Sequence, residues 1–90
     1  MDAKSTAASN GEMPKLLLPL AKAIRARRQF LGLSQEKLAD RCGFDRTYIS
    51  MLERGKRNPS FLNLLRLAEG LETSVSSLTA EYKHGPRSHR

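Results

Sequence analysis

One stretch, Gln35–Gly55, constrains the fold of this chain more than any other part of its sequence. It reads QEKLADRCGFDRTYISMLERG, which predicts a short helix over residues 35–42, a turn over 43–45 and a second helix over 46–54. Gly43 lies where the chain must leave the first of these helices, a position that favours a left-handed backbone. The stretch therefore predicts two short helices joined by a tight turn.

The side chains of these two helices fit one supersecondary motif. Ala39 is small enough to let two helices cross steeply, and apolar residues turn inward at helical spacing: Leu38, Cys42, Ile49 and Leu52. A helix, a glycine-containing turn and a second helix form a helix-turn-helix, whose second helix enters the major groove of DNA. The pattern therefore predicts a DNA-binding domain.

The formal charge of +7 over 90 residues is concentrated in one part of the chain. Residues 15–58 carry 11 Lys or Arg against four acids, whereas residues 59–82 carry one Arg against three Glu. This asymmetry indicates a basic face for a polyanion and a second face for another contact. The alternative, surplus charge that only keeps a small protein in solution, is the weaker reading once the helix-turn-helix is considered.

Several function classes find no support in the sequence. A lone cysteine, Cys42, excludes an internal disulfide and is expected to be a small buried hydrophobe. We find no signal peptide, no apolar run long enough for a membrane span, no metal-ligand spacing and no phosphate-cradling loop. We therefore expect no enzyme, no metal, no cofactor and no small-molecule ligand, and a cytoplasmic, nucleoid-associated protein.

The rest of the chain predicts an all-α fold with flexible ends. Residues 1–14 are small and polar and are expected to form a disordered N-terminal arm, and residues 83–90 a basic flexible tail. Between them, a helix is expected from near Leu16 or Pro19 to about Leu31. With the motif and two further helices, residues 15–82 predict a compact five-helix bundle.

The two further helices are predicted from their caps and their apolar spacing. Serines are expected to cap the helices that follow them, at positions 34, 60 and 74. A helix over 61–69 is expected to face inward through Phe61, Leu64, Leu65 and Ala68, and Gly70 to end it. A last helix is expected over residues 75–82.

Residues 20–80 resemble the phage-repressor/Cro-type (XRE) helix-turn-helix domain, which has a five-helix, lambda-repressor-like fold. The segment LGLSQEKLADRCGFDRTYISMLERGKRNPS carries the resemblance. The small size and the pattern DRTYIS, ERG and RN are most similar to the controller proteins of restriction-modification systems, compact dimeric regulators that bind paired operator sites. The resemblance implies a transcriptional regulator that binds double-stranded DNA as a homodimer on a palindromic or pseudo-palindromic operator.

Two further partners follow from the same resemblance. A regulator that activates transcription would also contact RNA polymerase. The alternative function is an antitoxin or antirepressor-like module of the same fold that binds another protein. The basic pair Lys56 and Arg57 favours DNA.

The base-reading residues are expected at the start and middle of the second motif helix. Arg46 is the main candidate because a guanidinium can donate to two acceptors of guanine; its alternative role is a phosphate contact. Thr47 and Ser50 follow; threonine can offer either its hydroxyl or its methyl group, the latter against thymine. Met51 either reaches the groove or packs on the flank of the helix.

The expected contacts with the DNA backbone surround that helix. The resemblance implies that Gln35 holds a phosphate at the start of the first motif helix, where free amides add to the contact. The other candidates flank the second helix and are Tyr48, Arg54, Lys56, Arg57 and Asn58. A core role for Tyr48 remains the alternative.

Two structural roles complete the expected set. The resemblance pairs Glu53 with Arg28 in a shielded ion pair. Asp45 is expected to cap the second motif helix with its carboxylate; its alternative role is a base contact, which the repulsion between an acid and phosphates disfavours. The dimer surface is expected on the less basic C-terminal helices, through Leu62, Leu67, Leu71, Val75 and Leu78. The alternative is that these five residues all belong to the core of one chain.

Overall fold

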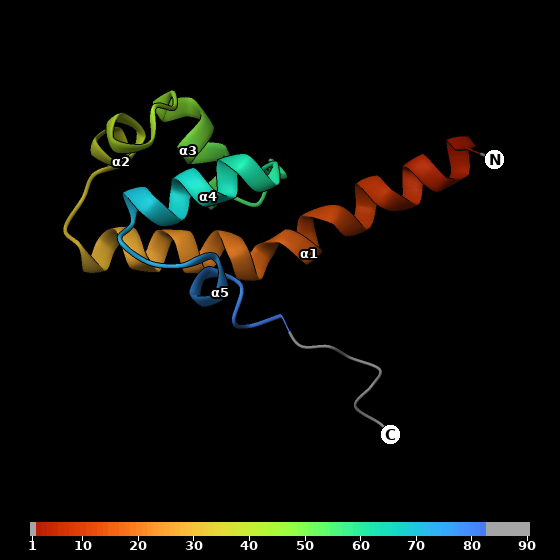
Figure 1. Ribbon diagram of the computed structural model, residues 1–90. Coiled ribbons are helices and arrows are strands. Elements are labelled where there is room, and N and C mark those ends of the chain that lie inside the picture. The colour runs from red at the N-terminus through yellow and green to blue at the C-terminus, as the bar shows by residue number, and fades with distance from the viewer. Residues whose placement is uncertain (1, 83–90) are drawn as a thin grey trace, which may run out of the picture.

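The computed structural model describes the backbone of residues 2–82 and the side chains of residues 15–82. This part of the chain forms helices and no strand, which confirms the all-α prediction (Figure 1). The helices are α1 Asp2–Phe30, α2 Gln35–Cys42, α3 Arg46–Glu53, α4 Phe61–Gly70 and α5 Val75–Leu78. None of the helices in the described part is both long and apolar enough to cross a membrane.

The first helix is longer than the sequence predicts. It begins at Asp2 rather than near Leu16 or Pro19, and so includes most of the stretch expected to be a disordered arm. Extending an existing helix costs much less free energy than nucleating one, and alanines favour the extension. The helix therefore continues past the segment that packs on the domain (Figure 1). The predicted tail, residues 83–90, lies outside the described residues.

A bend in α1 separates this extension from the packed part (Figure 1). Pro19 has no amide hydrogen, so the helical hydrogen bond to the carbonyl four residues earlier is missing there. Beside it, the Tyr82 hydroxyl accepts from the Leu20 amide at 3.2 Å and donates to the Leu16 carbonyl. Proline and an inserted side-chain group are both recognised causes of helix bending. Tyr82 thus joins the end of the described chain to α1 on both sides of Pro19.

The two motif helices form as predicted. Ser34 caps α2, where its Oγ accepts from the Lys37 amide at 3.0 Å, and Gly43 ends α2 in the left-handed conformation with φ 77°. The inward residues of α2 and α3 join residues of α1 in one core. The fully buried core residues of these three helices include Ile24, Leu38, Ile49 and Leu52. The helix α3 ends at Glu53, one residue earlier than expected.

The orientation of α4 differs from the prediction. Leu67 and Ala68 are buried, whereas Phe61 and Leu65, expected to face inward, are exposed. The core lies against the face formed by residues 64, 67, 68 and 71, which also have helical spacing. Because six of the ten residues of α4 have apolar side chains, periodicity alone does not choose between the two faces. The last helix, α5, ends at Leu78 and is four residues shorter than expected.

A close contact between α2 and α4 depends on Gly70. This glycine is the last residue of α4, and a Cβ added to it would lie 2.6 Å from the Cys42 sulfur. Cys42 is buried as predicted, and this burial raises the pKa of its thiol to about 11. The thiol is therefore protonated at neutral pH, in keeping with a packing role.

We expect Gly70→Ala to destabilise the protein by about 1–3 kcal/mol, because the new methyl group overlaps the Cys42 sulfur. Alanine favours a helix more than glycine does, so backbone preference cannot explain a loss. Cys42→Ala removes the overlapping atom. Urea unfolding of both single variants and the double variant should show a smaller effect of Gly70→Ala in the Cys42→Ala background. Equal effects in both backgrounds would contradict the packing explanation.

Candidate nucleic-acid interface

The helix α3 has one buried face and one accessible face. Ile49 and Leu52 are buried in the core, whereas Arg46 and Thr47 are exposed at the N-terminal end of the helix. Ser50 and Met51 are half-buried on the same helix. The four residues predicted to read bases therefore remain accessible to different degrees, and Arg46 and Thr47 are the most accessible.

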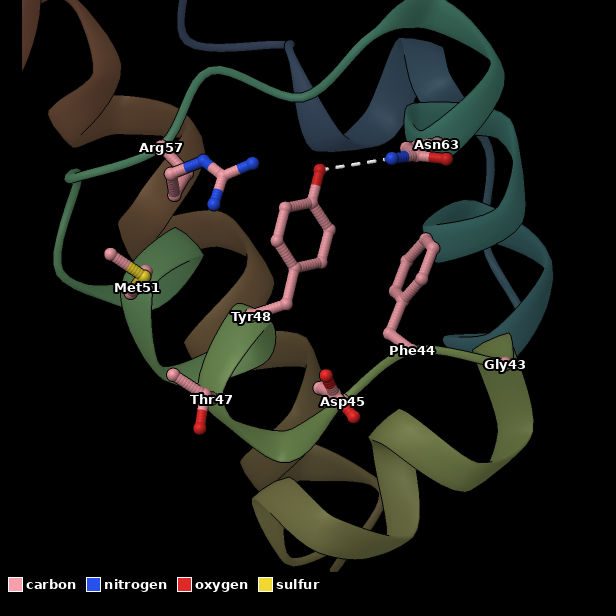
Figure 2. Close-up of a pocket in the computed structure, with 8 residues that line it drawn as sticks. All are labelled: Gly43, Phe44, Asp45, Thr47, Tyr48, Met51, Arg57 and Asn63. Atoms are coloured by element: carbon pink, nitrogen blue, oxygen red, sulfur yellow. Dashed lines mark hydrogen bonds between the residues drawn. The ribbon is translucent and has the colours of Figure 1, made fainter.

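Asp45 precedes α3 but does not cap it through its side chain. The residue occupies the N-cap position with an extended backbone, yet its carboxylate accepts no capping hydrogen bond. The predicted cap is therefore wrong in its hydrogen bond, although the position is right. Asp45 is exposed, and its side chain lines a hollow beside α3 together with Thr47 (Figure 2). A free carboxylate at this place repels phosphate, which limits where a DNA strand can pass.

A buried ion pair joins α1 to α3. Arg28 donates from Nε to one Glu53 oxygen at 2.6 Å and from Nη2 to the other at 2.9 Å. The two side chains are only 12% and 3% exposed, and Arg28 also donates to the Leu33 carbonyl at 2.8 Å. The hydrogen bond to Glu53 raises the pKa of Arg28. The structure thus contains the shielded pair that the resemblance implies.

Gln35 is part of the same network. Its Nε2 donates to Glu53 Oε1 at 3.1 Å, so Glu53 contacts side chains from α1 and α2 as well as ending α3. A glutamine amide has two hydrogens, and the second remains available to a phosphate. The phosphate contact of Gln35 stays a prediction, and its orientation is fixed by Glu53.

Tyr48 lies at the centre of a cluster beside α3, which we call the Tyr48 cluster: Phe44, Tyr48, Arg57 and Asn63 (Figure 2). The Phe44 and Tyr48 rings meet edge to face with centroids 4.9 Å apart, and the Arg57 guanidinium lies 5.0 Å from the Tyr48 ring centre. The Asn63 amide donates to the Tyr48 hydroxyl at 3.0 Å. Tyr48 therefore packs against the core, as its alternative role predicts, and its hydroxyl bonds to Asn63. Its contact with the DNA backbone stays a prediction.

Asn63 was not predicted as a site residue. It lies 15 positions after Tyr48 and on another helix, and its place in the sequence indicates only the first turn of α4. No local pattern relates the two residues. Only the tertiary structure, in which α4 packs on α2, brings them together.

The loop after α3 presents the other predicted backbone contacts. The four predicted residues of this loop are all exposed: Arg54, Lys56, Arg57 and Asn58. Arg54 Nε also donates to the Ser50 carbonyl at 3.3 Å, near the C-terminal end of α3. Exposed cations lie at both ends of α3: Arg46 at its N-terminal end, and Arg54, Lys56 and Arg57 after its C-terminal end.

Two other arginines, Arg27 and Arg41, form hydrogen bonds with main-chain carbonyls of the same domain. Arg27 donates to the carbonyls of Leu71 and Glu72, each at 2.8 Å, and Arg41 donates to the Gly70 carbonyl at 3.0 Å. These carbonyls lie at the end of α4, where helical donors are missing. Part of the excess of positively charged residues therefore stabilises the domain and does not contribute free cations for a polyanion.

The predicted dimer surface is largely wrong. Leu67, Leu71 and Leu78 are buried in the core of the single chain, because α4 turns the face that contains Leu67 inward. Such residues have no surface to offer a second copy. Val75 is half-buried against the same core, and Leu62 is 58% exposed. Its exposed neighbours on α4 are Phe61 at 68% and Leu65 at 45%.

The chain is similar to known proteins over this same region. The profile of the family described as helix-turn-helix matches residues 24–78. The control protein C.SmaI of Serratia marcescens is 46% identical over 59 residues, which cover 66% of this chain and 70% of that protein. The restriction-modification controller protein C.AhdI of Aeromonas hydrophila superposes with a TM-score of 0.67 at 42% identity, over 69% of this chain and 94% of that one.

A third similar protein has been solved with DNA. The restriction-modification controller protein C.Esp1396I, as a tetramer in complex with its natural 35 base-pair operator, superposes with a TM-score of 0.67 at 36% identity. The match covers 73% of this chain and 87% of that chain.

We expect Glu53→Gln to lower the free energy of unfolding by about 3–5 kcal/mol, because it leaves the shielded Arg28 guanidinium without its counter-charge. The matched control is Glu72→Gln, which removes the carboxylate of the exposed pair with Arg41 and should cost at most about 1 kcal/mol. Urea unfolding measures both. Equal losses in the two variants would contradict the structural role of Glu53.

Proposed function

Because the chain belongs to the helix-turn-helix family whose profile matches residues 24–78, we propose that it binds double-stranded DNA in a sequence-specific manner and regulates transcription. The observation that carries this proposal is the accessible face of α3. Arg46 and Thr47 are exposed there, and Ile49 and Leu52 fix the helix from the opposite side. We assign no enzymatic activity to the chain.

The proposed recognition surface contains two groups of residues: readers, which contact base edges, and anchors, which contact phosphates. Residues near the start of a recognition helix reach base edges, so Arg46 and Thr47 are the main readers, and Ser50 and Met51 lie further along the groove. Lys56, Arg57 and Asn58, on the loop after α3, hold phosphates beside the groove. Gln35 adds a phosphate contact at the start of α2. Arg54 and Tyr48 complete the anchors.

We further propose that the regulator is a homodimer that controls restriction-modification genes. One recognition helix reads only a few base pairs, and two copies related by a twofold axis read half-sites about 34 Å apart. Similarity to the control protein C.SmaI and to C.Esp1396I, solved as a tetramer on its operator, supports this assignment. Such a regulator acts on the nucleoid in the cytoplasm, and activation would add a contact with RNA polymerase.

The exposed apolar side chains of α4 are the proposed dimer surface. Phe61, Leu62 and Leu65 lie in one stretch of the helix and are 68%, 58% and 45% exposed. Exposed apolar groups that cluster in this way mark interaction sites more often than isolated ones do. This surface replaces the buried leucines predicted from the sequence.

Selection of bound duplexes from random DNA tests the function as a whole. A regulator of this kind selects a palindromic or pseudo-palindromic sequence with two half-sites. Failure to enrich any sequence, together with stable capture of a partner protein, would favour the antitoxin-like alternative.

We expect Arg46→Ala to weaken binding to the selected operator by about 1–3 kcal/mol and to relax the preference at one base position of each half-site. The exposed side chain has no packing role, so folding should not change. Fluorescence anisotropy with a set of single-base operator variants measures both effects. Equal weakening on all variants would instead assign Arg46 to a phosphate.

Lys56→Ala is the matched control for base reading. This exposed loop cation is expected to weaken all operator variants alike and to reduce the slope of log affinity against log salt by about 1. A change in base preference in this variant would contradict its assignment as an anchor.

We expect Leu62→Glu and Leu65→Glu to produce monomers that fold normally but lose tight operator binding, because a carboxylate at either place opposes an apolar contact between copies. Sedimentation at micromolar concentration and thermal unfolding measure the two properties. Leu16→Glu makes the same change at another exposed leucine, on α1, and should leave the dimer intact. Dimers that persist in both α4 variants would place the interface elsewhere.

A further inference from the structure

The hydroxyl of Tyr48 has a donor on one side and, among the side chains and main chain of residues 15–82, no acceptor on the other. Asn63 Nδ2 donates to the tyrosine oxygen at 3.0 Å, so the oxygen acts as an acceptor in this bond. The hydroxyl hydrogen must then point elsewhere, since a phenol has one hydrogen to donate. Among residues 15–82, the structure shows no group that accepts it.

The ring that carries this hydroxyl is held in one orientation. Phe44 contacts it edge to face at 4.9 Å between centroids and an interplanar angle of 75°. The Arg57 guanidinium lies over the same ring at 5.0 Å. Figure 2 shows the hydroxyl between the Arg57 guanidinium and the Asn63 amide, at a hollow of about 380 Å³ beside α3. The hydroxyl is therefore fixed by the Tyr48 cluster before any ligand arrives.

We propose that Asn63 is a positioning residue for DNA recognition: by occupying the acceptor side of the Tyr48 hydroxyl, it directs the hydroxyl hydrogen to a phosphodiester oxygen of the DNA backbone. This inference rests on the proposed function. A phosphodiester group offers only acceptors, which suits a donor that has no acceptor within the described residues. The neighbouring Arg57 guanidinium adds a charge-assisted donor for the same strand.

This arrangement separates two kinds of backbone contact. Arg57 neutralises phosphate charge, so its contribution to binding depends on salt. Tyr48 contributes a neutral hydrogen bond, which releases no counterion. A donor that is already held in place loses little conformational entropy on binding. By holding the Tyr48 hydroxyl, Asn63 therefore lowers the entropic cost of its hydrogen bond to DNA.

Tyr48→Phe and Asn63→Ala, alone and together, test the inference on the operator selected by the wild-type protein. Tyr48→Phe keeps the ring and its contact with Phe44. Asn63→Ala keeps the cap of α4, because the Ser60 Oγ accepts from the main-chain amide of residue 63 at 3.1 Å. Thermal unfolding checks that all three variants remain folded.

We expect Tyr48→Phe to weaken operator binding about 2- to 10-fold, the effect of one neutral hydrogen bond. Asn63→Ala should weaken it by the same factor or less, and the double variant should bind no more weakly than Tyr48→Phe alone. The salt dependence and the base preference should stay as in the wild-type protein, whereas Arg57→Ala should reduce the salt slope by about 1.

Three results would overturn the inference. Wild-type affinity in Asn63→Ala would show that Tyr48 needs no positioning. A double variant weakened by the product of the single factors would make Asn63 an independent contact. An altered base preference in Tyr48→Phe would place the hydroxyl at a base edge instead of a phosphate. If the wild-type protein selects no DNA sequence, the proposed function itself fails, and this inference fails with it.

Discussion

The buried charge of Glu53 is the constraint on which the arrangement of the first three helices depends. A carboxylate with a side chain 3% exposed is costly unless it is paired and fully hydrogen-bonded. Here Arg28 of α1 provides two donors and Gln35 of α2 provides a third, while the carboxylate itself belongs to the end of α3. Three helices must therefore meet at one place for the charge to be stable.

This requirement links stability to recognition. The accessible end of α3 can present Arg46 and Thr47 reproducibly only if the helix is fixed at its other end and along its buried face. The ion pair fixes that end, and Ile49 and Leu52 fix the face. The packing of α2 on α3, with Ala39 of α2 buried in the shared core, sets the remaining direction.

The C-terminal half of the domain uses main-chain carbonyls in a similar way. Arg27 and Arg41 donate to the carbonyls of residues 70–72, at and just after the end of α4, so α1 and α2 hold the turn that follows α4. Gly70 lets that end approach Cys42 closely. As a result, α3 and the exposed apolar face of α4 belong to one domain with a shared core, which suits a protein proposed to place two recognition helices at a fixed spacing.

The sequence by itself determined the helix-turn-helix, the capping serines, the left-handed Gly43 and the accessible start of α3, because each depends on residues close together in the chain. The structure confirms these and also contains the Arg28–Glu53 pair, which the family resemblance implied. Tertiary structure alone decided which face of α4 is buried. Its apolar residues surround most of the helix, and only packing against the other helices determines which of them are buried. It also decided the contacts of Asn63 with Tyr48 and of Tyr82 with α1, which join residues 15 or more positions apart through packing that no local pattern encodes.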